Sequence, residues 1–180
     1  MRNLAFASAS PVVLQARLDQ LDLEPIMVKL MDPEEGEGWS LDQVRTMATW
    51  YKRFLFLNAL YPDRSIVPTK AIDTFWHYHI LDTEKYAEDC QTVFGNFLHH
   101  FPYFGMRGEE DRMNLLDASE KTTELFRQHF EDAPTSLQGE AGKCVSDCGG
   151  RSCSHCQSPT CSKVSDIQHT VRPRLVSAVA

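Results

Sequence analysis

The sequence lacks the motifs that identify several common enzyme classes. It contains no P-loop, no glycine fingerprint of a dinucleotide-binding fold and no H-E-x-x-H zinc-protease motif, so none of these activities is indicated. Lysine and arginine form no dense run and the net charge is −7, which argues against a nucleic-acid-binding surface. No apolar stretch approaches the roughly 20 residues of a membrane-spanning helix. We therefore expect neither a nucleic-acid partner nor insertion into a membrane.

A recognisable signal peptide is also missing. An Ala-Ser-Ala sequence at residues 7–9 mimics a cleavage site, but the apolar run before it is too short for a signal peptide. We therefore expect a cytoplasmic protein. The 180 residues are enough for one domain with a substantial core and too few for two large domains.

Strand patterns are absent as well, because no segment strictly alternates apolar and polar residues. Apolar residues instead recur at helical spacing and predict an all-α domain of about five helices over residues 10–132. The first predicted helix runs from Pro11 to Met31 with Ser10 as N-cap, and Pro25 is a point where it can be interrupted. Its expected apolar stripe consists of Val13, Leu14, Leu18 and Leu21.

Four further helices are predicted from caps and periodicity. The second helix begins after Ser40, where Gln43 completes a capping-box pattern. The next two are expected over Thr69 to Leu81 and, with Asp82 as N-cap and Gly95 as stop, over the segment that follows. The last covers Glu109 to Phe130. Its expected inward-facing residues are Met113, Leu116, Leu125, Phe126 and Phe130.

The stretch from Ala71 to Gly105 carries four of the seven histidines. In a helix over this region, Asp73 and His77 lie one turn apart on the same face, where side chains can meet. His79 lies roughly 200° around the helix from His77. We therefore do not expect these two histidines to share a ligand unless the helix ends between them.

The second half of this stretch, residues 96–105, is short and aromatic, and Pro102 and Gly105 break it. We expect a loop that folds back onto the body and carries His99 and His100 with it. The apolar side chains that this folding is expected to bury are Phe97, Leu98, Phe101, Tyr103 and Phe104.

A metal site can be built from these polar residues. Asp73, His77 and one or both of His99 and His100 supply the carboxylate and imidazole donors of a zinc or non-haem iron site. The alternative is structural, because His77 can bond Asp73, and His99 and His100 can anchor their loop by donating to backbone carbonyls. Both interpretations remain open from the sequence.

One cysteine, Cys90, is expected on the apolar face of its helix. A buried cysteine usually acts as a small apolar residue. A thiolate–imidazole pair with His77 or His99 is the alternative, although no third residue that would orient such a pair is identifiable.

The composition changes at Ala133, after which residues 133–180 are rich in small and polar residues and contain no aromatic residue. Such a segment buries too little apolar area to offset the entropy of ordering, so we expect a disordered tail. It carries one C-x-x-C pair, and His155 lies among its cysteines. The tail cysteines are Cys144, Cys148, Cys153, Cys156 and Cys161. Three roles are open for them: binding zinc or copper(I), remaining as reduced thiols, and serving as a substrate for modifying enzymes.

A series of short motifs runs through the central stretch. It comprises Asp73-x-x-Trp76-His77, Ile80-Leu81-Asp82-Thr83, Tyr86, Asp89-Cys90, Gly95 and His99-His100-x-Pro102. This order resembles the motif series of the glycine-rich-domain-containing-protein-like family, over about Ser40 to Phe130. That family occurs in plant glycine-rich proteins and as small bacterial proteins, some with similar tail cysteines set among more glycines. Because its biochemical role is poorly defined, the resemblance implies little about chemistry.

Two functions from different classes follow from these observations. In the first, the helical domain binds a metal ion, the thiol-rich tail buffers or delivers metal, and an open coordination position makes the domain a candidate metalloenzyme. In the second, the aromatic and histidine motifs build a rigid scaffold that acts by binding another protein. Metal content distinguishes the two.

Overall fold

The computed structural model describes residues 10–131 and 172–175. Within these ranges it contains six α-helices and no strand, which confirms the all-α class with one helix more than expected. No helix in the described part of the chain is both long and apolar enough to cross a membrane. The five tail cysteines and His155 lie outside the described residues, so their roles stay predictions.

The additional helix arises at Pro25. The segment predicted as one helix forms α1 (Pro11–Asp19) and α2 (Glu24–Met31), joined by a short turn. Pro25 is the second residue of α2, where its missing N–H costs no helical hydrogen bond. Ser10 caps α1 as predicted, but Val13 is 45% exposed and does not belong to the buried stripe.

The remaining helices begin within one residue of the predicted positions, and the two caps predicted for them, Ser40 and Asp82, are present. Ser40 forms a capping box with Gln43 at the start of α3 (Leu41–Leu60). The side chain of Thr69 caps α4 (Lys70–Leu81), and Asp82 caps α5 (Thr83–Phe94), which ends at Gly95 in the left-handed conformation. α6 (Glu109–His129) begins with three acidic residues, which suit the positive end of the helix dipole.

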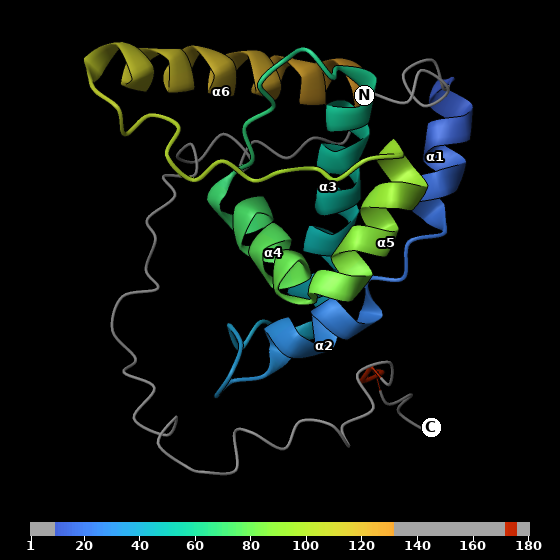
Figure 1. Cartoon of the computed structure of the whole chain (residues 1–180). Helices are drawn as coiled ribbons and strands as arrows, with labels where there is room; N and C mark the ends of the chain where they lie inside the picture. The colour runs from blue at the N-terminus through green and yellow to red at the C-terminus, as the bar shows by residue number, and fades with distance from the viewer. Residues whose placement is uncertain (1–9, 132–171, 176–180) are drawn as a thin grey trace.

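Helix α3 forms the centre of the bundle. It contacts α1, α2, α4 and α6, and Figure 1 shows α6 lying across one end of the bundle with α2 near the other. Each large apolar side chain that is fully buried contributes about 2 kcal/mol to folding. The largest fully buried aromatic and aliphatic side chains are Tyr51, Tyr86, Phe54, Phe75, Leu18, Leu30, Leu57 and Ile72.

The predicted inward face of α6 is wrong over its first half. Met113 and Leu116 are 54% and 47% exposed, whereas Leu115 and Ala118 are buried. Leu115 and Leu116 are adjacent apolar residues, so the periodicity fits two faces of the helix about equally well. Packing decides between them, and the second half of the helix, with Leu125 and Phe126 buried, follows the prediction.

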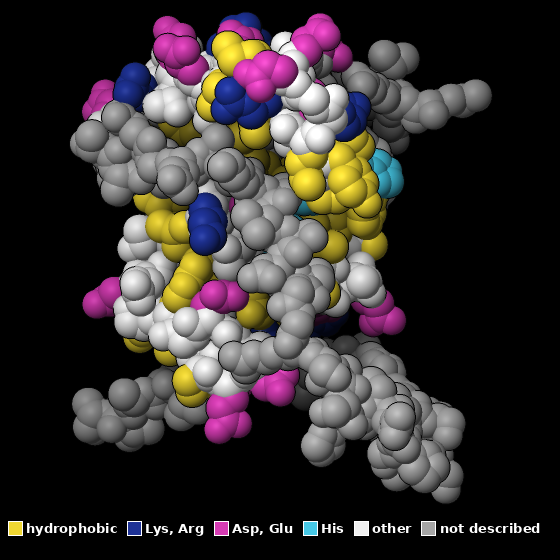
Figure 2. All heavy atoms as spheres, turned by 90° about the vertical axis from the view of Figure 1, so that its left-hand side faces the viewer, with side chains coloured by type: hydrophobic (Ala, Val, Ile, Leu, Met, Phe, Trp, Pro, Cys, Tyr) yellow, Lys and Arg dark blue, Asp and Glu magenta, His cyan; other side chains and the backbone are white. Residues whose placement is uncertain are grey.

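The loop 96–105 folds back toward α4, but it buries fewer aromatic side chains than expected. Leu98 and Phe104 are partly buried, whereas Phe97, Phe101 and Tyr103 are 43%, 53% and 58% exposed. The side chains of a loop that lies on the surface cannot all point toward the helices. Those that point away from the helices stay exposed to solvent. Figure 2 shows hydrophobic side chains gathered on this side of the molecule, with a histidine at their edge.

Candidate metal centre

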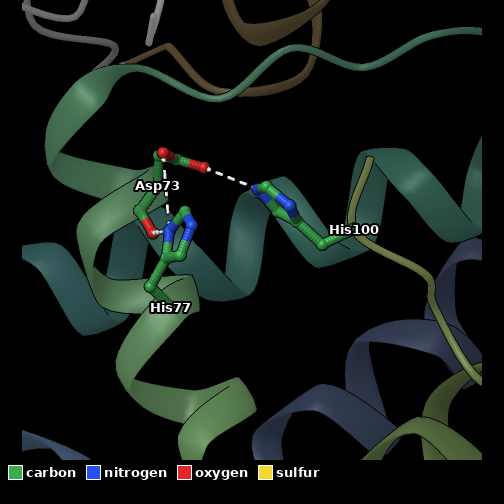
Figure 3. Close-up of side chains that lie close together, drawn as sticks. All are labelled: Asp73, His77 and His100. Atoms are coloured by element: carbon green, nitrogen blue, oxygen red, sulfur yellow. Dashed lines mark hydrogen bonds and ion pairs between the residues drawn. The ribbon is translucent and has the colours of Figure 1, made fainter. Parts of the chain in front are cut away.

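Helix α4 and the loop 96–105 bring three potential metal ligands together. Asp73 and His77 lie one turn apart on α4, as the sequence predicts, and His100 approaches from the loop. Figure 3 shows the Asp73 carboxylate between the two imidazole rings. Asp73 is only 7% exposed, the His77 side chain is 46% exposed, and the His100 side chain is 13% exposed.

Short distances connect the three side chains. His100 Nε2 lies 3.2 Å from Asp73 Oδ1, and His77 Nδ1 lies 3.5 Å from Asp73 Oδ2. The two rings have their centroids 4.6 Å apart. One donor atom from each residue can be chosen so that all three lie within 4.8 Å of one another. The group is therefore able to hold a metal ion.

Hydrogen bonds fix the protons in this arrangement. His77 Nδ1 is 2.7 Å from the backbone carbonyl of Asp73, and a carbonyl can only accept, so this nitrogen donates and Nε2 carries the lone pair. His100 Nε2 donates to the Asp73 carboxylate. A metal ion bound by the His100 nitrogen and the carboxylate would take the place of that proton.

The loop that carries His100 is held by a chain of aromatic side chains. Trp76 Nε1 donates to the Tyr86 hydroxyl at 2.9 Å, and that hydroxyl donates to the Leu98 carbonyl at 2.5 Å. The Trp76 ring also lies against the His100 ring, with centroids 4.6 Å apart. Helices α4 and α5 thus determine the position of His100, and neither Trp76 nor Tyr86 was expected to have this role from the sequence.

His99 does not join the group. It is exposed, and its ring contacts Phe97 at a centroid distance of 5.0 Å. Neighbouring residues of an extended chain point in opposite directions, so only one of two adjacent histidines can face Asp73. Of the two histidines that the sequence left as alternatives, the structure therefore brings His100 to the site.

The remaining histidine of α4, His79, faces the opposite way and is 1% exposed. Its Nδ1 is 2.8 Å from the Tyr51 hydroxyl and its Nε2 is 2.9 Å from Asp89 Oδ2, which Lys85 also contacts at 2.8 Å. Both ring nitrogens are thus occupied by protein partners. The expectation that His79 and His77 do not share a ligand is confirmed.

Cys90 is buried on the inward face of α5, as predicted. Burial raises the pKa of its thiol, against hydrogen bonds with Leu98 and Tyr86 that lower it. A raised pKa keeps the sulfur protonated and poorly nucleophilic. The structure therefore favours the packing role of Cys90 over a thiolate–imidazole pair.

A cavity of about 370 Å³ adjoins the group and is lined by both Asp73 and His100. This volume lies at the lower end of the range usual for small-molecule sites, roughly 300 to 1,000 Å³. Most of its wall is apolar, with Arg64 and Arg107 as its two cationic side chains. The apolar wall includes Ile66, Val67, Trp76, Phe104 and Leu115.

Asp111, at the start of α6, holds the part of the loop that contributes Arg107 to the cavity wall. Its carboxylate accepts from the backbone N–H of Gly105 at 2.7 Å and from Arg107 Nη2 at 2.6 Å. The hydrogen bond from Arg107 lowers the pKa of Asp111 to about 2. Gly105 has φ 87°, and a Cβ there would come 2.5 Å from the Leu115 side chain, so the tight turn requires glycine.

Comparison with known protein families gives one match, to the family described as UCP032817-like, over residues 15–119. The chain belongs to this family. The resemblance to the glycine-rich-domain-containing-protein-like family is therefore wrong as an assignment, and the short motifs that suggested it are not sufficient to identify a family. No curated protein and no solved structure shows significant similarity to the chain.

The UCP032817-like match covers all three members of the metal-ligand group and most of the cavity lining. It ends within α6, before the cysteine-rich segment. Because the family is uncharacterised, it assigns no activity to these residues. The chemistry must be argued from the site.

Proposed function

We propose that the helical domain binds one divalent transition-metal ion through Asp73, His77 and His100. The observation that carries this proposal is the convergence of a nearly buried carboxylate with two imidazoles, one of them brought from a separate loop. Two imidazoles and one carboxylate form the ligand set of catalytic zinc sites and of non-haem iron sites. Zinc and ferrous iron are therefore the two candidates.

The distances are compatible with such an ion. Two donors bound at about 2.1 Å to the same metal lie at most about 4.2 Å apart. His100 Nε2 already lies 3.2 Å from an Asp73 oxygen, within this limit. The His77 side chain is 46% exposed, and its ring has to rotate to bring Nε2 to the same ion, because Nδ1 donates to the Asp73 carbonyl.

Three protein ligands leave coordination positions open, which is the mark of a catalytic rather than a structural site. The adjoining cavity gives a small molecule with an apolar body access to an ion held there. An ion in this place would act as a Lewis acid or activate a bound water. We therefore consider the domain a candidate metalloenzyme.

The tail cysteines extend this proposal. Thiolates bind soft ions such as copper(I) and also bind zinc, so the segment would buffer metal or deliver it to the helical domain. This role requires reduced thiols, and thiols stay reduced in the cytoplasm, where we expect the protein to be.

The test is metal analysis of the full chain purified without an affinity tag or chelator. Replacing the five tail cysteines by serine leaves the helical site as the main candidate, and we expect close to one zinc or iron per chain. In this background His100→Ala and His77→Ala should each lose the metal. His99→Ala is the matched control, because it removes an adjacent imidazole that lies outside the group.

Two results would contradict the proposal. The first is that the chain with serine in place of the five tail cysteines holds no metal after reconstitution with zinc and, under anaerobic conditions, with ferrous iron. The second is equal metal content in the His99→Ala and His100→Ala variants. Metal found only when the tail cysteines are present would move the metal chemistry to the tail.

A second function, binding of another protein, is favoured by one specific observation. Large apolar side chains are exposed in and beside the loop 96–105, where a monomer gains nothing from them. If no variant binds metal, the scaffold function becomes the better proposal. The exposed side chains concerned are Phe97, Phe101, Tyr103 and Met106.

A further inference from the structure

Four residues of the predicted tail, 172–175, are described and lie against the helical body. Figure 1 shows them in red, near α2 and far from α6, although they follow α6 in the sequence. Their sequence is Arg-Pro-Arg-Leu. Composition alone did not indicate this contact, because the segment has neither aromatic residues nor helical periodicity.

Arg172 makes the strongest contact of the segment. Its Nε and Nη2 donate to the two carboxylate oxygens of Asp82, at 2.5 and 2.9 Å. This paired geometry is particular to arginine, because a lysine ammonium offers no planar fork. Asp82 is also the N-cap of α5, and the Arg172 hydrogen bond lowers its pKa below the usual range.

Arg174 and Leu175 make a second set of contacts, at the start of α2. Arg174 pairs with Asp22 and with Glu24, the latter at 3.2 Å between Nη1 and Oε2. The backbone N–H of Leu175 donates to Glu24 Oε1 at 2.7 Å, and its side chain packs against the main core. The contact therefore combines charge, a backbone hydrogen bond and apolar packing.

The spacing of the segment matches these partners. Arg172 and Leu175 are partly buried against the body, Pro173 is exposed, and Arg174 reaches its two acidic partners from an exposed position. Pro173 fixes its own φ and favours an extended conformation at Arg172. The segment therefore loses less conformational entropy on binding than a proline-free sequence would.

We propose that Asp22, Glu24 and Asp82 form a binding site for arginine-containing peptides of the type Arg-Pro-Arg-Leu, which residues 172–175 of the same chain occupy. The attachment holds the far end of the cysteine-bearing stretch 132–171 on the body, whose near end continues from α6. Both ends of the thiol-rich segment are thereby kept within reach of the helical domain. This proposal does not depend on the metal site.

The expected affinity follows from the tether. Because residues 132–171 tether the segment to the helical domain, its effective concentration at the site is about millimolar. For the segment to be bound most of the time, a free peptide of the same sequence must bind the vacated site with a Kd of about 1 mM or tighter. Because charge contributes strongly, the affinity should fall at about 1 M salt, where electrostatic screening acts within about 3 Å.

The test uses the full chain labelled with ¹⁵N. Arg172→Gln with Arg174→Gln removes the cationic contacts without altering the body, and we expect the amide signals of Glu24 and Lys85 to shift. The matched control, Arg112→Gln with Lys121→Gln, removes the same charge from ion pairs on α6 and should leave these two signals unchanged.

A synthetic Val-Arg-Pro-Arg-Leu-Val peptide is then titrated into the Arg172→Gln, Arg174→Gln chain. It should return the Glu24 and Lys85 signals toward their wild-type positions, whereas the same peptide with glutamine for both arginines should not. A peptide with lysine for Arg172 should bind several-fold more weakly, because it cannot form the paired hydrogen bonds to Asp82.

Three results would overturn the proposal. Unchanged signals in the Arg172→Gln, Arg174→Gln chain would show that the segment does not occupy the site. A peptide Kd weaker than about 10 mM would be too weak for the segment to stay bound against its tether. Wild-type signals that depend on protein concentration would mean that the segment binds a second copy instead of its own chain.

Discussion

Helix α4 presents a histidine on each of two faces, and the two surroundings differ in one decisive respect. His79 is sealed in the core, with Tyr51 on one ring nitrogen and Asp89 on the other. His77 is half exposed and shares Asp73 with a histidine from a separate loop. Both surroundings contain histidine and aspartate, so residue type does not distinguish them.

The comparison shows what separates a structural histidine from a candidate ligand. In the sealed network, made of Tyr51, His79, Lys85 and Asp89, each ring nitrogen already has a partner, and none of the four residues lines the cavity beside Asp73. In the metal-ligand group, donors converge on one point beside a cavity of about 370 Å³. We therefore expect the sealed network to affect stability and the metal-ligand group to affect binding.

The largest expected effect comes from opening the sealed network. His79→Ala leaves the Tyr51 hydroxyl and the Asp89 carboxylate without their shared partner and creates a cavity. We expect a loss of about 2 to 4 kcal/mol in the free energy of unfolding, measured by urea titration. A loss below about 1 kcal/mol would mean that the network is not a structural element.

The metal-ligand group should respond to metal instead. In the chain whose five tail cysteines are replaced by serine, zinc at 100 times its dissociation constant should raise the free energy of unfolding by about 2.7 kcal/mol. His100→Ala should abolish this increase while changing the stability of the metal-free protein by less than about 1 kcal/mol. Parallel urea titrations with and without zinc measure both quantities. If zinc raised the free energy of unfolding equally with and without the His100→Ala substitution, His100 would not be a metal ligand.

Acid should weaken the sealed network first through Asp89. Burial raises the pKa of this carboxyl, but hydrogen bonds from His79 and Lys85 outweigh burial and leave it below its ordinary value. A pKa that is lower in the folded state means that the stabilisation is present above about pH 4 and disappears as the pH falls further. Stability of the wild type should therefore fall as the pH drops from about 4 to about 3.

Asp89→Asn provides the control for this acid effect. It cannot titrate, so its stability should be lower than wild type at pH 6 and should change less between pH 6 and pH 3. Urea titrations of both chains at the two pH values make the measurement. An identical acid dependence would assign the effect to other carboxylates, such as Asp111, whose pKa of about 2 also makes it an acid-sensitive contact.

The smallest effect is expected at His99, which belongs to neither surrounding. Its side chain is exposed, its ring contacts Phe97, and it lines the cavity without being one of the three ligands. His99→Ala should change the free energy of unfolding by less than about 0.5 kcal/mol and leave the metal content unchanged. A loss of metal in this variant would show that the loop can present either histidine to Asp73.

Local rules in the sequence predicted most of the helical framework. The caps at Ser10, Ser40 and Asp82 and the stop at Gly95 all lie where expected, because capping depends only on residues within one turn. The i, i+4 placement of Asp73 and His77 was predictable for the same reason. The family was not, because the short motifs suggested a different one.

Contacts between distant segments were beyond those rules. Whether Leu115 or Leu116 faces inward depends on where α6 lies, and the anchoring of residues 172–175 depends on three acids over 80 residues away in the chain. The sequence by itself determined the all-α class, most of the helix starts, the stop at Gly95 and the face that Asp73 shares with His77. Only the tertiary structure decided that His100, and not His99, completes the group, because the direction of a side chain on a loop depends on the packing of Trp76, Tyr86 and Leu98 beneath it.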